Sequence, residues 1–402
     1  MKNFRILPIK RKRIMRTFII FLSLCLLTVP NITHAQSPQE SRIETFTIPM
    51  PQLGNRQKDI QVYLPPNYDS SDTAYPVVYL HNGDDLFNPR PEASGDYKVD
   101  ETLDELFFEG SLGGVIVVGI EVDRDSPWDE YMPWVNENMY DWVKSDNSNP
   151  IQGGEGFAFI EFIVNTLKPE IDSRYRTLPD RENNAIGGFC RGAIFPIIVG
   201  ISYPEVFSKV MSVSPAVWMA EDGGRWLSNN HLINFINRVP IPLNVKFYLE
   251  IGTKESSGSR PPVKDQDGKR ITYPQAYLEG AEIVYRSLIN NGLPETNITY
   301  RIIEGSKGGR DEWGTRIDDI FLYFFSDLEI PTSTPTSTPA STPASTPTLT
   351  PNLTTSPIPE SLIEMVEPAE SKSTTSTITV VIVICVLLGL SYLLLIRFLK
   401  QR

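Results

Sequence analysis

Short apolar runs alternate with longer amphipathic stretches through residues 36–330. The later apolar runs are rich in β-branched residues and nearly continuous, which is typical of parallel strands covered on both faces. The stretches between them space their apolar residues as one face of a helix does. This alternation predicts one α/β domain, a mostly parallel sheet with helices on both faces, whose functional loops follow the strands. The predicted strands are Ile43–Ile48, Ile60–Leu64, Val77–His81, Val115–Val122, Ala185–Gly187, Val210–Val213, Val245–Ile251 and Ile298–Ile303. The predicted helices are Glu101–Glu109, Phe157–Arg174, Ala193–Ile201, Tyr273–Asn291 and Arg316–Leu328.

One long segment, residues 123–154, has no clear period and is rich in aromatic residues and turn formers. We interpret it as an insertion beside the functional site. Its aromatic residues either line a cleft for a sugar or aryl group or simply pack the insertion, and the sequence leaves both interpretations open. They are Trp128, Tyr131, Trp134, Tyr140 and Trp142.

The N-terminal 35 residues have the pattern of a signal peptide. Seven Lys and Arg residues lie between positions 2 and 16, and an apolar run follows from Thr17 to Val29. This run is too short to span a bilayer comfortably, and the small residue Ala35 allows cleavage after it. The alternative is an uncleaved N-terminal anchor.

The C-terminal end predicts a single transmembrane helix over residues 378–399. At about 1.5 Å per residue this apolar segment covers the hydrocarbon core of a bilayer. Basic residues at its end, including Lys400 and Arg402, place residues 400–402 in the cytoplasm and the large domain outside. Residues 331–377 repeat Pro, Thr and Ser with few large apolar side chains, which predicts a disordered, extended stalk. Whether the stalk is glycosylated stays open.

Charge and cysteine content narrow the possible partners. The chain carries a net charge of −12, although both predicted membrane-targeting ends are basic and contain no acid. The exported part is therefore strongly acidic, which argues against nucleic acid and anionic lipid as partners. Cys25 and Cys385 fall in the two apolar ends, so Cys190 is alone in the domain and no disulfide can form there. With three histidines and no phosphate-binding loop, we expect neither a metal nor a cofactor.

The segment with the clearest chemistry is Gly188-Phe189-Cys190-Arg191-Gly192, between a predicted strand and a predicted helix. It is the nucleophile-elbow pattern G-x-S-x-G with cysteine in place of serine. Small residues flank the nucleophile because the turn is sharp, and the side chain projects at a helix N-terminus, which favours an anion. This pattern predicts that Cys190 occupies a nucleophile position.

Together with this elbow, four segments resemble the Putative esterase family of α/β-hydrolases, which includes esterase D, enterochelin esterases and feruloyl esterase modules. They are residues 75–87, 130–134, 162–176 and, after the elbow, 203–207 with 212–216, and the resemblance covers most of residues 42–328. It implies an α/β-hydrolase fold and hydrolysis or transfer of the acyl group of a carboxylic ester. The substrate would be a small-molecule ester or a surface glycan or lipid. The residues that it implies on the oxyanion and substrate side are Asn82, Gly83, Arg191, Tyr131 and Trp134.

The family's Ser, acid and His positions match Cys190, Glu255 and Arg310 in this chain. A guanidinium cannot accept a proton at physiological pH, so Arg310 cannot replace the base. His34 lies in or beside the signal peptide, and neither His81 nor His231 has a counterpart role. We therefore expect weak or no hydrolysis, and the alternatives are an altered mechanism through Cys190 or a non-catalytic binding module. At the site we expect an Arg310–Glu255 pair and a thiol pKa modestly below its ordinary value of about 8.5.

Overall fold

A computed structural model describes residues 39–87, 95, 97–123, 128–136, 153–220, 227, 230–256 and 269–327. From Glu40 onward these residues belong to one compact unit. The predicted signal peptide, stalk and transmembrane helix lie outside the described residues, as does most of the insertion, with Tyr140 and Trp142. Within the described ranges, no helix is both long and apolar enough to cross a membrane.

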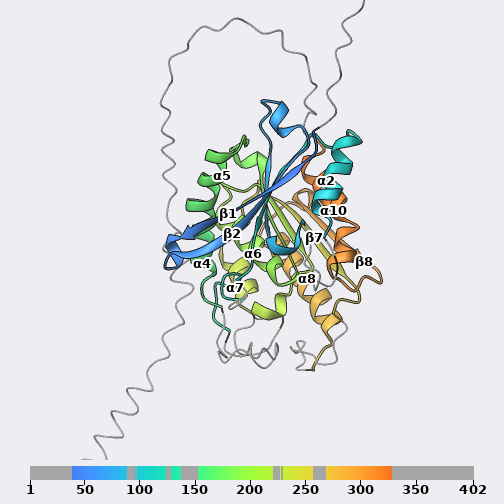
Figure 1. Ribbon diagram of the computed structural model, residues 1–402. Helices are drawn as coiled ribbons and strands as arrows, with labels where there is room; N and C mark the ends of the chain where they lie inside the picture. The colour runs from blue at the N-terminus through green and yellow to red at the C-terminus, as the bar shows by residue number, and fades with distance from the viewer. Residues whose placement is uncertain are drawn as a thin grey trace, which may run out of the picture. The chain divides into compact units, whose positions relative to one another are not determined.

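An eight-stranded sheet forms the centre of the domain, with strand order β1-β2-β4-β3-β5-β6-β7-β8 (Figure 1). β1 pairs antiparallel with β2, and β2 pairs antiparallel with β4, while every other neighbouring pair is parallel. The predicted mostly parallel sheet is confirmed. The strands are β1 (Arg42–Met50), β2 (Arg56–Leu64), β3 (Val77–His81), β4 (Ile116–Ile120), β5 (Asn184–Phe189), β6 (Lys209–Val213), β7 (Lys246–Gly252) and β8 (Ile298–Ile303).

Helices cover both faces of this sheet and bury two separate apolar cores. One core lies under α4, α6, α7 and α8, and the other lies under α2 and α10. Successive strand residues alternate between the two cores, as Val77 and Val78 of β3 do, because side chains along a strand point to opposite faces. The helices are α2 (Val99–Phe108), α4 (Gly156–Phe162), α5 (Lys168–Arg174), α6 (Ile194–Ser202), α7 (His231–Arg238), α8 (Tyr273–Asn290), α9 (Arg310–Gly314) and α10 (Ile317–Phe325).

The predicted helix over residues 157–174 is continuous but changes its winding. A π-helical turn, Ile163–Leu167, joins α4 to α5. Pro169 follows directly and has no N–H to donate into the preceding turn, which explains why the regular hydrogen-bond pattern is interrupted there. Two short helices, α7 and α9, were not among the predicted elements, and α9 carries a predicted site residue.

Candidate active site at the cysteine elbow

Cys190 lies on a sharp turn between β5 and α6. Its φ is +52°, in the left-handed region that L-residues rarely adopt, and a 3-10 turn, Cys190–Ala193, leads into α6. Gly188 is required, because a Cβ there would overlap the carbonyl oxygen of Gly192, and a Cβ at Gly192 would fit tightly, 3.3 Å from the His81 Cβ. The strained nucleophile elbow that the motif predicts is therefore formed, with cysteine at its tip.

The sulfur of Cys190 is hydrogen bonded to a tyrosine. The hydroxyl of Tyr277, on the first turns of α8, lies 3.3 Å from Sγ. Burial raises the pKa of the Cys190 thiol, against the lowering effects of the Tyr277 hydrogen bond and the Arg191 charge. The predicted modest lowering of the thiol pKa is therefore wrong, because desolvation outweighs the favourable donors around the sulfur.

Glu255 follows β7 and is buried, with 3% of its surface exposed. Its Oε1 accepts hydrogen bonds from the Ser214 hydroxyl at 2.5 Å and the Gly252 N–H at 3.1 Å. Gly308 lies directly against the carboxylate, so that a Cβ there would overlap Oε2. Burial raises the pKa of Glu255 above its ordinary value, and the Ser214 hydrogen bond opposes this shift.

Arg310 begins α9 and forms an ion pair with Asp85, in the turn after β3. Its guanidinium also lies over the Tyr97 ring, 5.8 Å from the centroid. The predicted pair between Arg310 and Glu255 is wrong, because the guanidinium binds Asp85 while Glu255 accepts hydrogen bonds from Ser214 and Gly252. The loop after β8 is thus tied to the turn after β3.

Three residues of the predicted oxyanion side lie together beside the elbow. Asn82 has a left-handed φ of +67°, and its side-chain oxygen accepts a hydrogen bond from the Tyr131 hydroxyl at 3.3 Å. The amide of Asn82 donates to the Tyr97 hydroxyl at 3.4 Å. Gly83 approaches β4 so closely that a Cβ would lie 2.5 Å from the Gly119 carbonyl carbon. A turn held this tightly can present backbone donors at a fixed place, which is what stabilising an oxyanion requires.

A known protein family matches this chain. The family model described as Putative esterase matches residues 52–278, which is more than half of the chain. The chain belongs to this family.

Curated relatives of this esterase-family chain occur in Bacillus subtilis. The uncharacterized protein YbbA is 23% identical over 253 residues, covering 63% of this chain and 86% of YbbA. The ferri-bacillibactin esterase BesA is 24% identical over 184 residues, covering 43% of this chain and 60% of BesA.

Solved structures share the fold. The IroE-like serine hydrolase from Shewanella oneidensis superposes with a TM-score of 0.54 at 19% identity, covering 72% of this chain and 82% of that structure. A ferulic acid esterase gives a TM-score of 0.50 at 16% identity, covering 71% of this chain and 98% of that one. At these identities the likeness shows the α/β-hydrolase fold.

Arg191 and Trp134, the remaining predicted residues of the substrate side, differ in their surroundings. The Arg191 guanidinium lies 5.0 Å from the centroid of the Trp128 ring, which connects the elbow to the insertion. Trp134 stacks on His231 with ring centroids 5.5 Å apart and packs against Phe235. Trp134 is therefore part of the packed core, while Arg191 and Trp128 are only partly buried.

The two described histidines, His81 and His231, both pack against aromatic rings. His81 is fully buried, with its ring against those of Phe195 and Tyr131. Burial lowers the pKa of His81 to about 3, so it stays neutral, and neither ring nitrogen has a hydrogen-bond partner. His231 is partly buried, and its ring stacks on Trp134.

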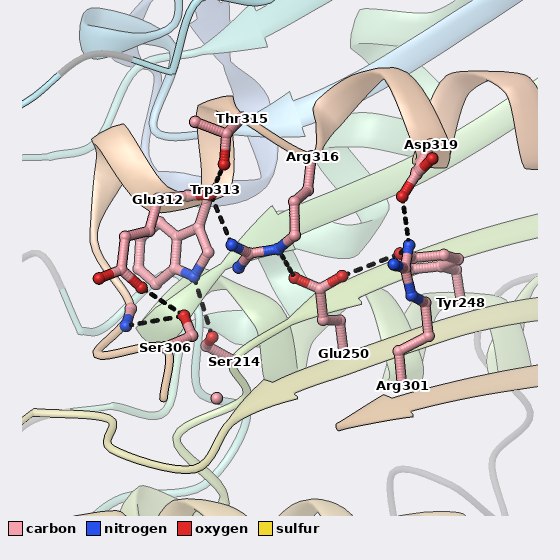
Figure 2. A network of polar contacts seen from close by, with 12 residues as sticks. Ser214, Tyr248, Glu250, Arg301, Ser306, Glu312, Trp313, Thr315, Arg316 and Asp319 are labelled. Atoms are coloured by element: carbon pink, nitrogen blue, oxygen red, sulfur yellow. Dashed lines mark hydrogen bonds and ion pairs between the residues drawn. The ribbon is translucent and has the colours of Figure 1, made fainter. Parts of the chain in front are cut away.

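A polar network supports the acid side of the site (Figure 2). The Trp313 indole N–H donates to the Ser214 hydroxyl at 3.0 Å, and Ser214 donates onward to Glu255. Ser214 has a left-handed φ of +55°, which places its hydroxyl between these two side chains. Sequence reasoning assigned no role to Ser214 or Asp85, and nothing in the sequence distinguished Tyr277 from other residues of an amphipathic helix.

Proposed function

We propose that this chain is a carboxylic-ester hydrolase or acyltransferase by descent, with weak or no hydrolytic activity. The observation that carries this proposal is the partner of the nucleophile: the Cys190 sulfur is hydrogen bonded to the Tyr277 hydroxyl rather than to an imidazole. Burial holds the pKa of Tyr277 well above its ordinary value, so this phenol keeps its proton at neutral pH and cannot act as a general base. Loss of a triad member typically costs several orders of magnitude in rate.

The proposed substrate is a small-molecule ester. Family membership supports an ester, and two similar proteins are described as a ferri-bacillibactin esterase and a ferulic acid esterase. Trp128 lies beside the elbow through its contact with Arg191, which offers an aromatic surface to an aryl group.

Hydrolysis of p-nitrophenyl acetate by the full-length chain in detergent tests the proposal, with Cys190→Ala as the control. We expect steady turnover close to that of the control. Turnover of roughly 1 s⁻¹ or faster, as in ordinary enzymes, that Cys190→Ala abolishes would show that a base exists outside the triad position.

A non-catalytic binding module is the second candidate. It is supported by the separate partners of the triad positions, since Arg310 pairs with Asp85 and Glu255 accepts from Ser214. Calorimetric binding of ethyl ferulate, followed by chromatography of the recovered ligand, separates the two candidates. Intact ligand after binding supports the module, and free ferulate supports the hydrolase.

We also propose that the domain is exported and anchored to the membrane by residues 378–399, with its C-terminus in the cytoplasm. The support is the sequence: a basic, apolar N-terminal segment and a C-terminal apolar segment followed by Lys400 and Arg402. Protease treatment of intact cells should release a fragment of the domain. Protection of the domain until the cells are lysed would contradict this topology.

A further inference from the structure

We propose that Cys190 and Tyr277 form a thiol–phenol pair that takes an acyl group from an ester as a thioester and passes it to an amine rather than to water. This inference rests on the proposed function, in which Cys190 is the nucleophile and no imidazole assists it. It assigns to Tyr277 a role in proton transfer at the elbow.

The position of the Tyr277 hydroxyl is fixed by its helix. α8 begins with a capping box in which the Thr272 side chain accepts from the Gln275 N–H and Gln275 bonds back to the Thr272 N–H. The Tyr277 ring packs edge-on against Trp218, with centroids 6.1 Å apart. Only 4% of Tyr277 is exposed, and its hydroxyl is hydrogen bonded to Cys190. The capped start of α8 and the Trp218 contact therefore fix the Tyr277 hydroxyl beside the sulfur.

When Cys190 is ionised, the Tyr277 hydroxyl is the donor of this hydrogen bond, because a thiolate can only accept. Because the pKa of Tyr277 is raised well above its ordinary value, the phenol remains protonated where the thiol begins to ionise. Its hydrogen bond lowers the pKa of Cys190 and so opposes the effect of burial. Tyr277 thus increases the fraction of thiolate, which is the reactive form of cysteine.

The first step balances without any further reactant. The Cys190 sulfur attacks the ester carbonyl carbon, the S–C bond forms, and the bond from that carbon to the leaving oxygen breaks. The leaving alkoxide takes the Tyr277 proton, and Tyr277 recovers a proton that derives from the Cys190 thiol. The products are a thioester on Cys190 and a free alcohol.

The second step explains the choice of acceptor. Water must lose a proton to a base as it attacks, and Oε1 of Glu255, the acid whose charge acts on the thiol, already accepts from the Ser214 hydroxyl and the Gly252 N–H. A primary amine in its neutral form is a stronger nucleophile than water, so it attacks the thioester without a base and loses its proton afterwards. The C–N bond forms, the C–S bond breaks, and the thiolate regains the proton that the amine releases.

The test uses the full-length chain in detergent with p-nitrophenyl acetate and glycinamide as the acceptor. We expect a burst of one p-nitrophenolate per chain, an acetyl group on the peptide containing Cys190 by mass spectrometry, and faster release of that group as N-acetylglycinamide when glycinamide is added. Tyr277→Phe should slow the burst about tenfold at neutral pH, the loss of one charge-assisted hydrogen bond, and move its pH profile upward.

Tyr273→Phe is the matched control. Tyr273 lies one turn earlier on α8 and packs edge-on against the same Trp218, with centroids 5.5 Å apart. Its variant should leave the burst rate and its pH profile unchanged, because a packing role shared by both tyrosines would affect both variants alike.

Each outcome has a defined meaning. An unchanged burst and pH profile in Tyr277→Phe, or release that glycinamide does not accelerate, would overturn the inference. No acetyl group on Cys190 with negligible turnover would also overturn it, while the proposed weak activity would stand. Rapid steady turnover without a burst would instead overturn the proposed function. If Tyr277→Phe does not fold, the acetyl adduct on the unmodified chain and its release by glycinamide still decide the matter.

Discussion

Replacing Arg316 by methionine removes the cation that pairs with Glu250 (Figure 2). Arg316 Nε donates to Glu250 Oε1 at 2.7 Å, and a terminal nitrogen donates to the Glu312 carbonyl at 2.7 Å. Glu250 is 1% exposed and belongs to β7, the strand that carries Glu255 beyond its end. The change therefore leaves a carboxylate buried beneath the acid side of the site.

Breaking a buried pair by removing one partner typically costs about 3–5 kcal/mol. Glu250 keeps one donor, the Tyr248 hydroxyl at 2.9 Å, and Arg316 is not fully buried, so the lower end of that range applies. We expect Arg316→Met to lower the free energy of unfolding by about 3 kcal/mol. Neutralising the orphaned carboxylate in Arg316→Met/Glu250→Gln should restore about 2 kcal/mol of that loss.

Urea unfolding followed by circular dichroism measures both values, and the two single variants with the double variant form a complete cycle. The control is Arg286→Met on α8, because Arg286 pairs with Glu282 in an exposed position and should cost less than about 0.5 kcal/mol. A loss below about 1 kcal/mol in Arg316→Met, or a double variant no more stable than it, would refute the reasoning from burial.

Two further predictions concern Glu255. Gly308→Ala should lower the free energy of unfolding by at least about 1 kcal/mol more than Gly305→Ala does. Both glycines have left-handed φ values, but only at Gly308 would a Cβ overlap Glu255. Equal losses of stability in urea unfolding would contradict this prediction. Burial raises the pKa of Glu255 above its ordinary value of 4.5, so between these two values the folded state binds more protons and stability falls as pH rises. Glu255→Gln should remove that decline from the pH dependence of unfolding, and an unaltered profile would exclude Glu255 as its source.

The inner strands of the sheet, such as β3, β4 and β6, could be predicted from the sequence because they are nearly continuous apolar runs. β3 and β8 begin and end at the predicted residues. α7 was missed although its signals are present: Asn230 caps it by accepting from the Ile233 N–H, and its apolar residues face one core. With eight residues, the helix is too short to show a clear period. Local patterns thus predicted strands and long helices well and short helices poorly.

The elbow could also be predicted from a local pattern, because Gly188 and Gly192 flank Cys190 where larger side chains would crowd the turn. Its partners could not, because they come from distant parts of the chain. Tyr277 is 87 residues from Cys190, and Asp85 is 225 residues from Arg310. The error in the thiol pKa has a related cause, since a motif shows the helix end but not how deeply the sulfur is buried.

The ion pair between Arg310 and Asp85 has a consequence for how this chain can change over generations. Introducing histidine at position 310 would take the guanidinium away from a carboxylate whose side chain is only 4% exposed. A buried charge deprived of its partner typically costs about 3 kcal/mol, a large share of the stability of an ordinary domain. Replacement of Arg310 by histidine is therefore expected to be tolerated best when the charge at position 85 is lost first or together with it. The ion pair thus constrains the order in which substitutions at positions 85 and 310 can accumulate.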